Sequence, residues 1–175
     1  MNVKRKVSAS VGKFEELIGK IPGYKGYKQK ELRREADKLL RTTLANQLSD
    51  LRTKLTGLQL DFLSKGKLSL VDDLERAVGK LQILIDRLRT ASYGYAGLFD
   101  AVKIKEGELD ALYDFDTQLL TFVPRIDEGI AGVATALKAN GDLEGAIAGL
   151  TGVLQEMDIT FDHRQEAILK AEEPE

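Results

Sequence analysis

Apolar residues recur at alternating spacings of four and three along most of this chain, and this pattern restricts its fold more than any other feature. The stripes occupy four segments, at about 28–63, 68–90, 106–139 and 143–170. The first contains the uninterrupted run Leu44, Leu48, Leu51, Leu55, Leu58 and Phe62. A period near 3.6 residues places each stripe on one face of a helix, and the 4-3 spacing is typical of bundles and coiled coils. We therefore predict an all-α fold of four long helices.

The connections between these segments predict the order of the helices in space. Residues 64–67 and 140–142 are tight turns, and 91–105 is the longest connection. Short connections make successive helices antiparallel. We expect an up-down-up-down four-helix bundle in which the third helix is shorter than its partners.

The chain divides into three parts on this interpretation. Residues 1–27 form a basic amphipathic helix, with its apolar stripe in 7–21, followed by a Pro/Gly turn. Residues 28–170 form the bundle, and 171–175 form an acidic tail.

Composition limits the class of protein. The chain has 175 residues, of which 43% are hydrophobic and 31% charged, as expected for one folded domain. It has no cysteine, which excludes disulfides and thiolate chemistry and fits a reducing compartment. No apolar run approaches the roughly 20 residues of a membrane span, and no signal peptide is recognisable. We expect a cytoplasmic protein, with attachment to a membrane periphery left open.

Charge is distributed unevenly along the chain. Residues 1–41 contain twelve Lys or Arg and five Asp or Glu, a balance of +7, whereas the remainder has a balance of −9. Such a basic head can bind an acidic protein face or an anionic membrane, or it can pack on its own acidic body.

Aromatic and basic residues accompany the two Gly-rich segments, 21–27 and 91–105. The predicted topology brings both segments to the same end of the bundle. The candidate residues for binding a partner or ligand there are Tyr24, Lys25, Tyr27, Lys28, Lys30, Tyr93, Tyr95, Phe99 and Asp100. Tyrosine beside lysine suits an interface with a protein or with lipid headgroups. The alternative is that these rings close the open end of the bundle.

Asp116 falls at a core position of its stripe, and Arg164 interrupts the stripe of the last helix. Folding the last two helices about residues 140–141 places these two side chains at the same level. A buried carboxylate needs a partner, so we predict an Asp116–Arg164 ion pair. A structural role that fixes helix register is favoured over catalysis.

The sequence gives little indication of catalysis or metal binding. His163 is the one histidine, and no Glu-x-x-His motif of the di-iron bundles is present. A carboxylate site for Mg²⁺ or Ca²⁺ near Asp110, Asp114 and His163 has only a weak signal. No phosphate-binding loop or nucleophile–base set is found. We predict no cofactor and no metal, and favour a protein that is not an enzyme.

Three segments resemble an uncharacterised family of small all-helical bacterial proteins. They are Ile21-Pro22-Gly23-Tyr24-Lys25-Gly26-Tyr27, the stretch from Arg89 to Lys103 (RTASYGYAGLFDAVK), and the stretch from Glu108 to Asp116. The resemblance implies a helical fold and an accessory role near membrane-associated scaffolds. It implies no catalytic residues, because the family has no assigned activity.

These observations leave two classes of function. The first is a non-enzymatic helical interaction or scaffold module, bound to a protein partner or to an anionic membrane surface. The second is a small-ligand-binding or metal-binding protein, or an enzyme, with a pocket at the Tyr/Gly end. Nucleic-acid binding is not expected, because the basic run is short and the body acidic. The long stripe of 28–63 also leaves open a homodimer.

Overall fold

The described part of the chain is a bundle of four long helices. A computed structural model describes the backbone of residues 30–91 and 106–172 and the side chains of residues 38–91 and 114–166. The elements are α2 (Lys30–Ser64), the 3₁₀ turn η2 (Leu68–Leu70), α3 (Val71–Thr90), α4 (Glu106–Ala139) and α5 (Leu143–Glu172). The amphipathic helix expected at 7–21 lies outside the described residues.

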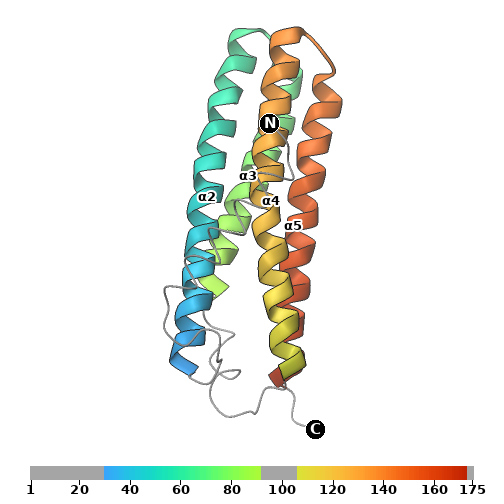
Figure 1. Cartoon of the computed structure of the whole chain (residues 1–175). Coiled ribbons are helices and arrows are strands. Elements are labelled where there is room, and N and C mark those ends of the chain that lie inside the picture. The colour runs from blue at the N-terminus through green and yellow to red at the C-terminus, as the bar shows by residue number, and fades with distance from the viewer. Residues whose placement is uncertain (1–29, 92–105, 173–175) are drawn as a thin grey trace.

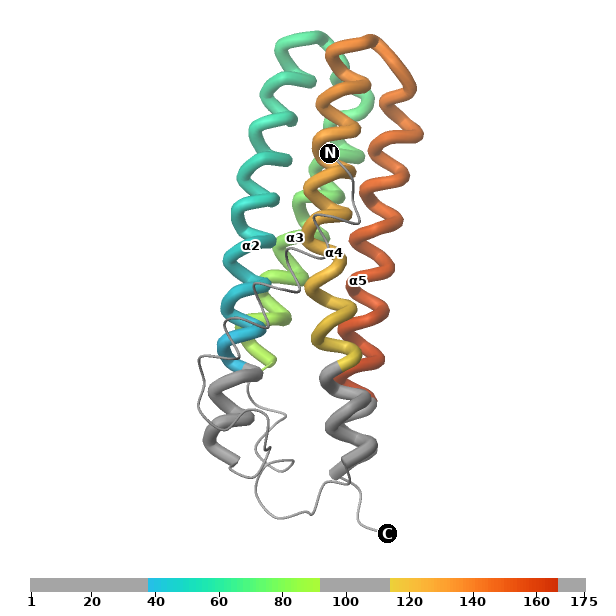
Figure 2. Tube along the Cα trace, in the orientation of Figure 1, coloured from blue at the N-terminus to red at the C-terminus, as the bar shows by residue number. Residues whose placement is uncertain are grey.

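Successive helices run in opposite directions, which gives the expected up-down-up-down order (Figure 1). Helix α2 packs mainly on α3 and α4 mainly on α5, while α2–α4 and α3–α5 contacts close the square. Figures 1 and 2 show the two tight turns at one end of the bundle, and Figure 1 shows the start of α2, the end of α3 and the start of α4 toward the other. With 20 residues, α3 is the shortest helix; α2, α4 and α5 have 35, 34 and 30.

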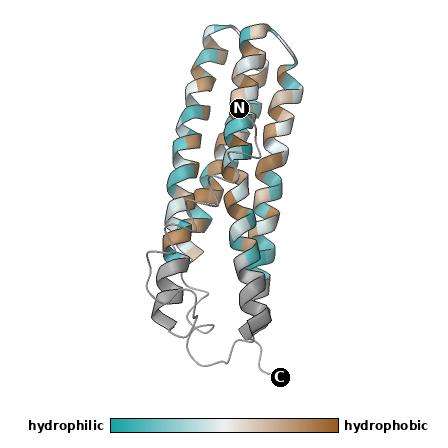
Figure 3. Ribbon diagram, in the orientation of Figure 1, coloured by the Kyte–Doolittle hydropathy of each residue, from teal (hydrophilic) through white to brown (hydrophobic). Residues whose placement is uncertain are grey.

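The stripes predicted from the sequence form the core. Leu44, Leu48 and Leu55 of α2 are fully buried, and all four helices contribute to one continuous cluster. Phe62 and Phe161 are the largest of its fully buried side chains. Figure 3 shows hydrophobic and hydrophilic residues alternating along each helix, as expected for amphipathic helices. None of the described helices is long and apolar enough to span a membrane.

The turn between α2 and α3 is a Schellman motif. Gly66 has φ +69°, Lys67 N donates to Phe62 O at 2.9 Å, and Gly66 N donates to Leu63 O at 3.1 Å. These bonds satisfy carbonyls at the end of α2, and the left-handed residue between the helices is one that glycine adopts without strain.

The sequence predicts Ser69 as the N-cap of α3, because Asp72 and Asp73 follow it in the first turn, but the structure differs. The 3₁₀ turn leads directly into the helix, so Leu70 occupies the cap position and no side chain caps it. At the corresponding place before α5, Asp142 Oδ1 accepts a hydrogen bond from Gly145 N at 2.8 Å, as an N-cap does.

Replacement of Gly66 by alanine tests the Schellman turn. A Cβ in the left-handed region costs about 1–2 kcal/mol, so we expect Gly66→Ala to lower the free energy of unfolding by that amount in urea denaturation. Gly79 is the matched control, because it is exposed inside α3 and a Cβ there has no neighbour within 4 Å. Gly79→Ala should raise stability by about 0.5–1 kcal/mol. Equal effects of the two substitutions would contradict this account.

Candidate functional site

The start of α2, the end of α3 and the start of α4 lie at the same end of the bundle (Figure 1). In the sequence, the Gly-rich segments 21–27 and 91–105 adjoin these helix ends. Lys30 is the first residue of α2, but its side chain is not described. The other candidate residues, Tyr24, Lys25, Tyr27, Lys28, Tyr93, Tyr95, Phe99 and Asp100, lie outside the described residues. Their grouping therefore stays a prediction.

A pocket opens between α2 and α3 close to this end. Its volume is about 350 Å³, and it is lined by Lys38, Arg41, Thr42, Ala45, Asn46, Leu88 and Arg89. We call it the α2–α3 pocket. Among the described lining residues three are cationic, two offer a hydroxyl or an amide, and none is acidic. Its chemistry is therefore that of a site for an anionic group.

Arg41 connects the pocket to the end of α3. Its guanidinium Nη1 donates to Leu88 O at 3.2 Å, and the residue is only 8% exposed. Leu88 O is one of the last four carbonyls of α3, which have no partner within the helix. A cation at this position also interacts favourably with the negative end of the helix dipole. Arg41 thus satisfies the end of α3 while it lines the pocket.

Lys38 and Arg89 are the other two cations of the pocket lining. Both are exposed, Lys38 on α2 and Arg89 in the last turn of α3. Exposed lysine and arginine side chains retain the freedom to reach a ligand. The pocket therefore combines one buried cation, held by the fold, with two cations at the solvent boundary.

Asp116 and Arg164 form the ion pair that the sequence predicts. Arg164 Nε donates to Asp116 Oδ1 at 2.6 Å, and their side chains are 3% and 15% exposed. The pair joins α4 to α5 inside the bundle. Its burial and its place between two core faces fit a structural role.

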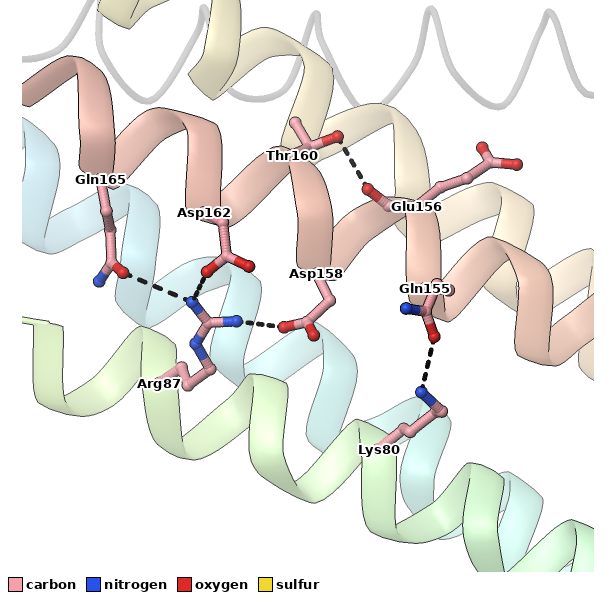
Figure 4. Close-up of polar contacts among 8 residues, drawn as sticks. All are labelled: Lys80, Arg87, Gln155, Glu156, Asp158, Thr160, Asp162 and Gln165. Carbon is pink, nitrogen blue, oxygen red and sulfur yellow. Dashed lines mark hydrogen bonds and ion pairs between the residues drawn. The ribbon is translucent and has the colours of Figure 1, made fainter.

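Arg87 forms a second polar junction, between α3 and α5 (Figure 4). Its guanidinium contacts the carboxylates of Asp158 and Asp162, and Nη2 lies 3.4 Å from Gln165 Oε1. The same group lies over the ring of Phe161, 4.9 Å from the ring centroid. Since Asp158 and Asp162 are four residues apart, they are neighbours on one face of α5. Arg87 therefore holds α3 in register with α5.

Sequence reasoning did not identify the α2–α3 pocket. Lys38 and Arg89 carry no pattern that separates them from ordinary surface cations. Arg41 offered a signal, because it directly follows Leu40 at the edge of the stripe, where a helix passes from buried to exposed. Its partner is a backbone carbonyl, however, and no residue type indicates such a contact.

The described side chains offer no arrangement for a metal. Among residues 38–91 and 114–166, no group of three His, Cys, Asp or Glu is placed to bind one. His163 and Asp114 are both exposed. Asp110 lies in α4, but its side chain is not described, so this candidate set is only partly placed.

Comparison of the sequence with protein-family models, with curated proteins and with solved structures finds no match. The resemblance of 21–27, 89–103 and 108–116 to a helical bacterial family is not tested by these comparisons.

Removal of Asp116 tests the buried pair. Asp116→Ala leaves the buried Arg164 guanidinium without this carboxylate, and we expect a loss of about 3–5 kcal/mol in the free energy of unfolding. The double variant Asp116→Leu/Arg164→Met should recover most of this lost stability, because an apolar pair avoids the desolvation of both charges.

Arg76→Ala is the control for this measurement. Arg76 pairs with Asp73 at the surface of α3, and such exposed pairs contribute about 0–1 kcal/mol. A loss from Asp116→Ala as small as that from Arg76→Ala would show that the buried pair is not structural.

Proposed function

We propose that this protein is a non-enzymatic helical interaction module that receives an acidic group of a partner protein in the α2–α3 pocket. The observation that carries the proposal is the lining of that pocket, where the described residues around about 350 Å³ include three cations and no carboxylate. Arginine and lysine in a concave site, with a hydroxyl and an amide beside them, suit a carboxylate of a partner.

The position of the pocket favours a protein over a membrane surface. Lys38 lies eight residues inside the start of α2, which is about 12 Å along the helix axis. A flat bilayer that touches the end of the bundle would not follow the side of α2 to this depth. An acidic side chain that projects from a partner protein can enter between the two helices.

The basic head of the sequence extends this proposal. Lys25, Lys28 and Lys30 immediately precede or begin α2, and Tyr24 and Tyr27 lie among them. We propose that these residues form the outer part of the same binding surface. Since exposed charges are screened by salt, binding should weaken as ionic strength rises.

The volume of the pocket supports a second candidate, a small anionic ligand. Small-molecule sites typically measure about 300–1,000 Å³, and this pocket lies at the lower limit. A thermal-shift screen with anionic metabolites separates the two, because a specific small ligand raises the melting temperature by mass action.

Charge reversal in the pocket tests the leading proposal. The variant Lys38→Glu/Arg89→Glu should lose the partner proteins that wild type retains in a quantitative pull-down from the native cell at low salt. We expect a loss of at least about tenfold, since each unfavourable interfacial charge costs several kcal/mol.

Arg76→Glu/Lys138→Glu is the matched control, because both residues are exposed near the opposite end and the change in net charge is the same. It should retain the partners. Equal retention by the two variants would refute the pocket as the binding site. Co-sedimentation with anionic vesicles that depends on Lys38 and Arg89 would show that these residues bind a membrane surface and not a protein partner.

A further inference from the structure

Large apolar side chains are exposed at the end of the bundle opposite the α2–α3 pocket. Leu60 is 67% exposed, Leu63 47% and Leu68 63%, and all three lie on or beside the last turns of α2. Leu60 and Leu63 are three residues apart and therefore share one side of the helix. Single exposed leucines are common on proteins, but a group of three needs an explanation.

These leucines belong to a longer uncharged surface, which we call the α2 outer face. Its solvent-accessible members on α2 are Thr42, Asn46, Ser49, Thr53, Thr56, Gly57, Leu60, Leu63 and Ser64. At 100° per residue they fall within an arc of about 120°. The charged residues Asp50, Lys54 and Asp61 lie on the side toward α4, where Lys54 pairs with Asp127. The half-buried Arg52 borders the face on the side toward α3. Nearly a third of the whole chain is charged, so a face of this length without a charge is unusual.

The neighbouring edge of α3 continues this surface. Leu68 is exposed, and Val71 and Val78 are half-buried against the core. The face is thus two helices wide at this end of the bundle, although Arg52 of α2 and Glu75 of α3 add charges on the side where the two helices adjoin.

We propose that the α2 outer face is the interface of a homodimer, in which it packs against the same face of a second copy of this chain. Along α2 it extends about 35 Å at 1.5 Å per residue, and along α3 it extends about 15 Å, from Leu68 to Val78. At a width of about 10 Å per helix this gives roughly 500 Å² per protomer, or about 1,000 Å² in total. That total is the lower limit for a specific interface, as expected of a dimer that dissociates on dilution.

The chemistry of the face favours a second copy. In an isologous interface the same surface of each protomer faces its copy, so a surface that carries charges of one sign would be repelled. The α2 outer face has no charged residue on α2, so two copies of it can pack without this repulsion. The sequence left open a homodimer formed through the apolar stripe of 28–63. The contact proposed here uses a different side of α2, because the described part of that stripe is buried in the protein's own core.

Sedimentation velocity of the full chain over a concentration series tests this proposal. Wild type should show a concentration-dependent dimer. Leu60→Glu should raise its dissociation constant by about a hundredfold or more, because each dimer loses two buried leucines and gains two buried charges. Ile83→Glu is the control, since Ile83 is similarly exposed at 57% but lies on the side of α3 away from α2. A wild-type monomer at all concentrations, or equal effects of the two variants, would overturn the proposal.

A single cysteine gives a second, independent test, because the chain has no cysteine of its own. Thr53 lies midway along the α2 part of this face and therefore close to the two-fold axis of an isologous dimer. Thr53→Cys should therefore form a covalent dimer under mild oxidation. Ala148→Cys, on the exposed side of α5, is the control. Cross-linking of Thr53→Cys no faster than that of Ala148→Cys would contradict the proposed face.

The two proposals fail separately. Leu60→Glu changes no residue of the α2–α3 pocket, and Lys38→Glu/Arg89→Glu changes no residue of the α2 outer face. If Leu60→Glu loses the dimer but retains the acidic partner, the dimer interface is supported independently of the pocket. If Lys38→Glu/Arg89→Glu loses the acidic partner but still dimerises, the pocket is supported independently of the dimer.

Discussion

Helix α3 ends at Thr90 while its neighbours continue toward the same end, and the carbonyl groups at this terminus need hydrogen-bond donors. Arg41 of α2 supplies one of them at Leu88 O, and it does so from a nearly buried position. A buried cation is costly unless it is paired, and the negative end of the α3 dipole is one favourable partner for it. The early end of α3 thus explains both the buried cation and the space beside it, and these two features together make the α2–α3 pocket.

Polar contacts at every side of the square have a common role. Arg41 joins α2 to α3, Arg87 joins α3 to α5, Asp116 and Arg164 join α4 to α5, and Lys54 pairs with Asp127 between α2 and α4. Leucine-rich stripes pack in more than one register, because neighbouring turns present similar side chains. A charged contact between two helices is satisfied in only one of these registers. We infer that the apolar core stabilises the bundle and that these contacts select its register.

The fold was predictable because helix periodicity is a local property of the sequence. The stripes gave the four helices and their ends to within a few residues, and the interruption of two stripes at Asp116 and Arg164 identified a pair 48 residues apart. The predicted cap at Ser69 was wrong, because the 3₁₀ turn Leu68–Leu70 contains Ser69 and leads directly into α3. The pocket was not predictable, since it depends on a backbone carbonyl and on the distance between two helix axes. The sequence did indicate that Leu60 and Leu63 are exposed, because both lie outside the apolar stripe of Leu55, Leu58 and Phe62.

The α2–α3 pocket and the α2 outer face are not independent surfaces. Thr42 and Asn46 line the pocket and also form one end of the uncharged face. A partner bound in the pocket therefore changes the surroundings of the proposed dimer interface, and the reverse holds with the same coupling free energy. If the second copy and the acidic partner exclude each other, the partner binds only monomers, and the dimer dissociates to supply them. Compatibility of the two would give a dimer with two pockets, whose combined affinity for a divalent partner exceeds that of one pocket.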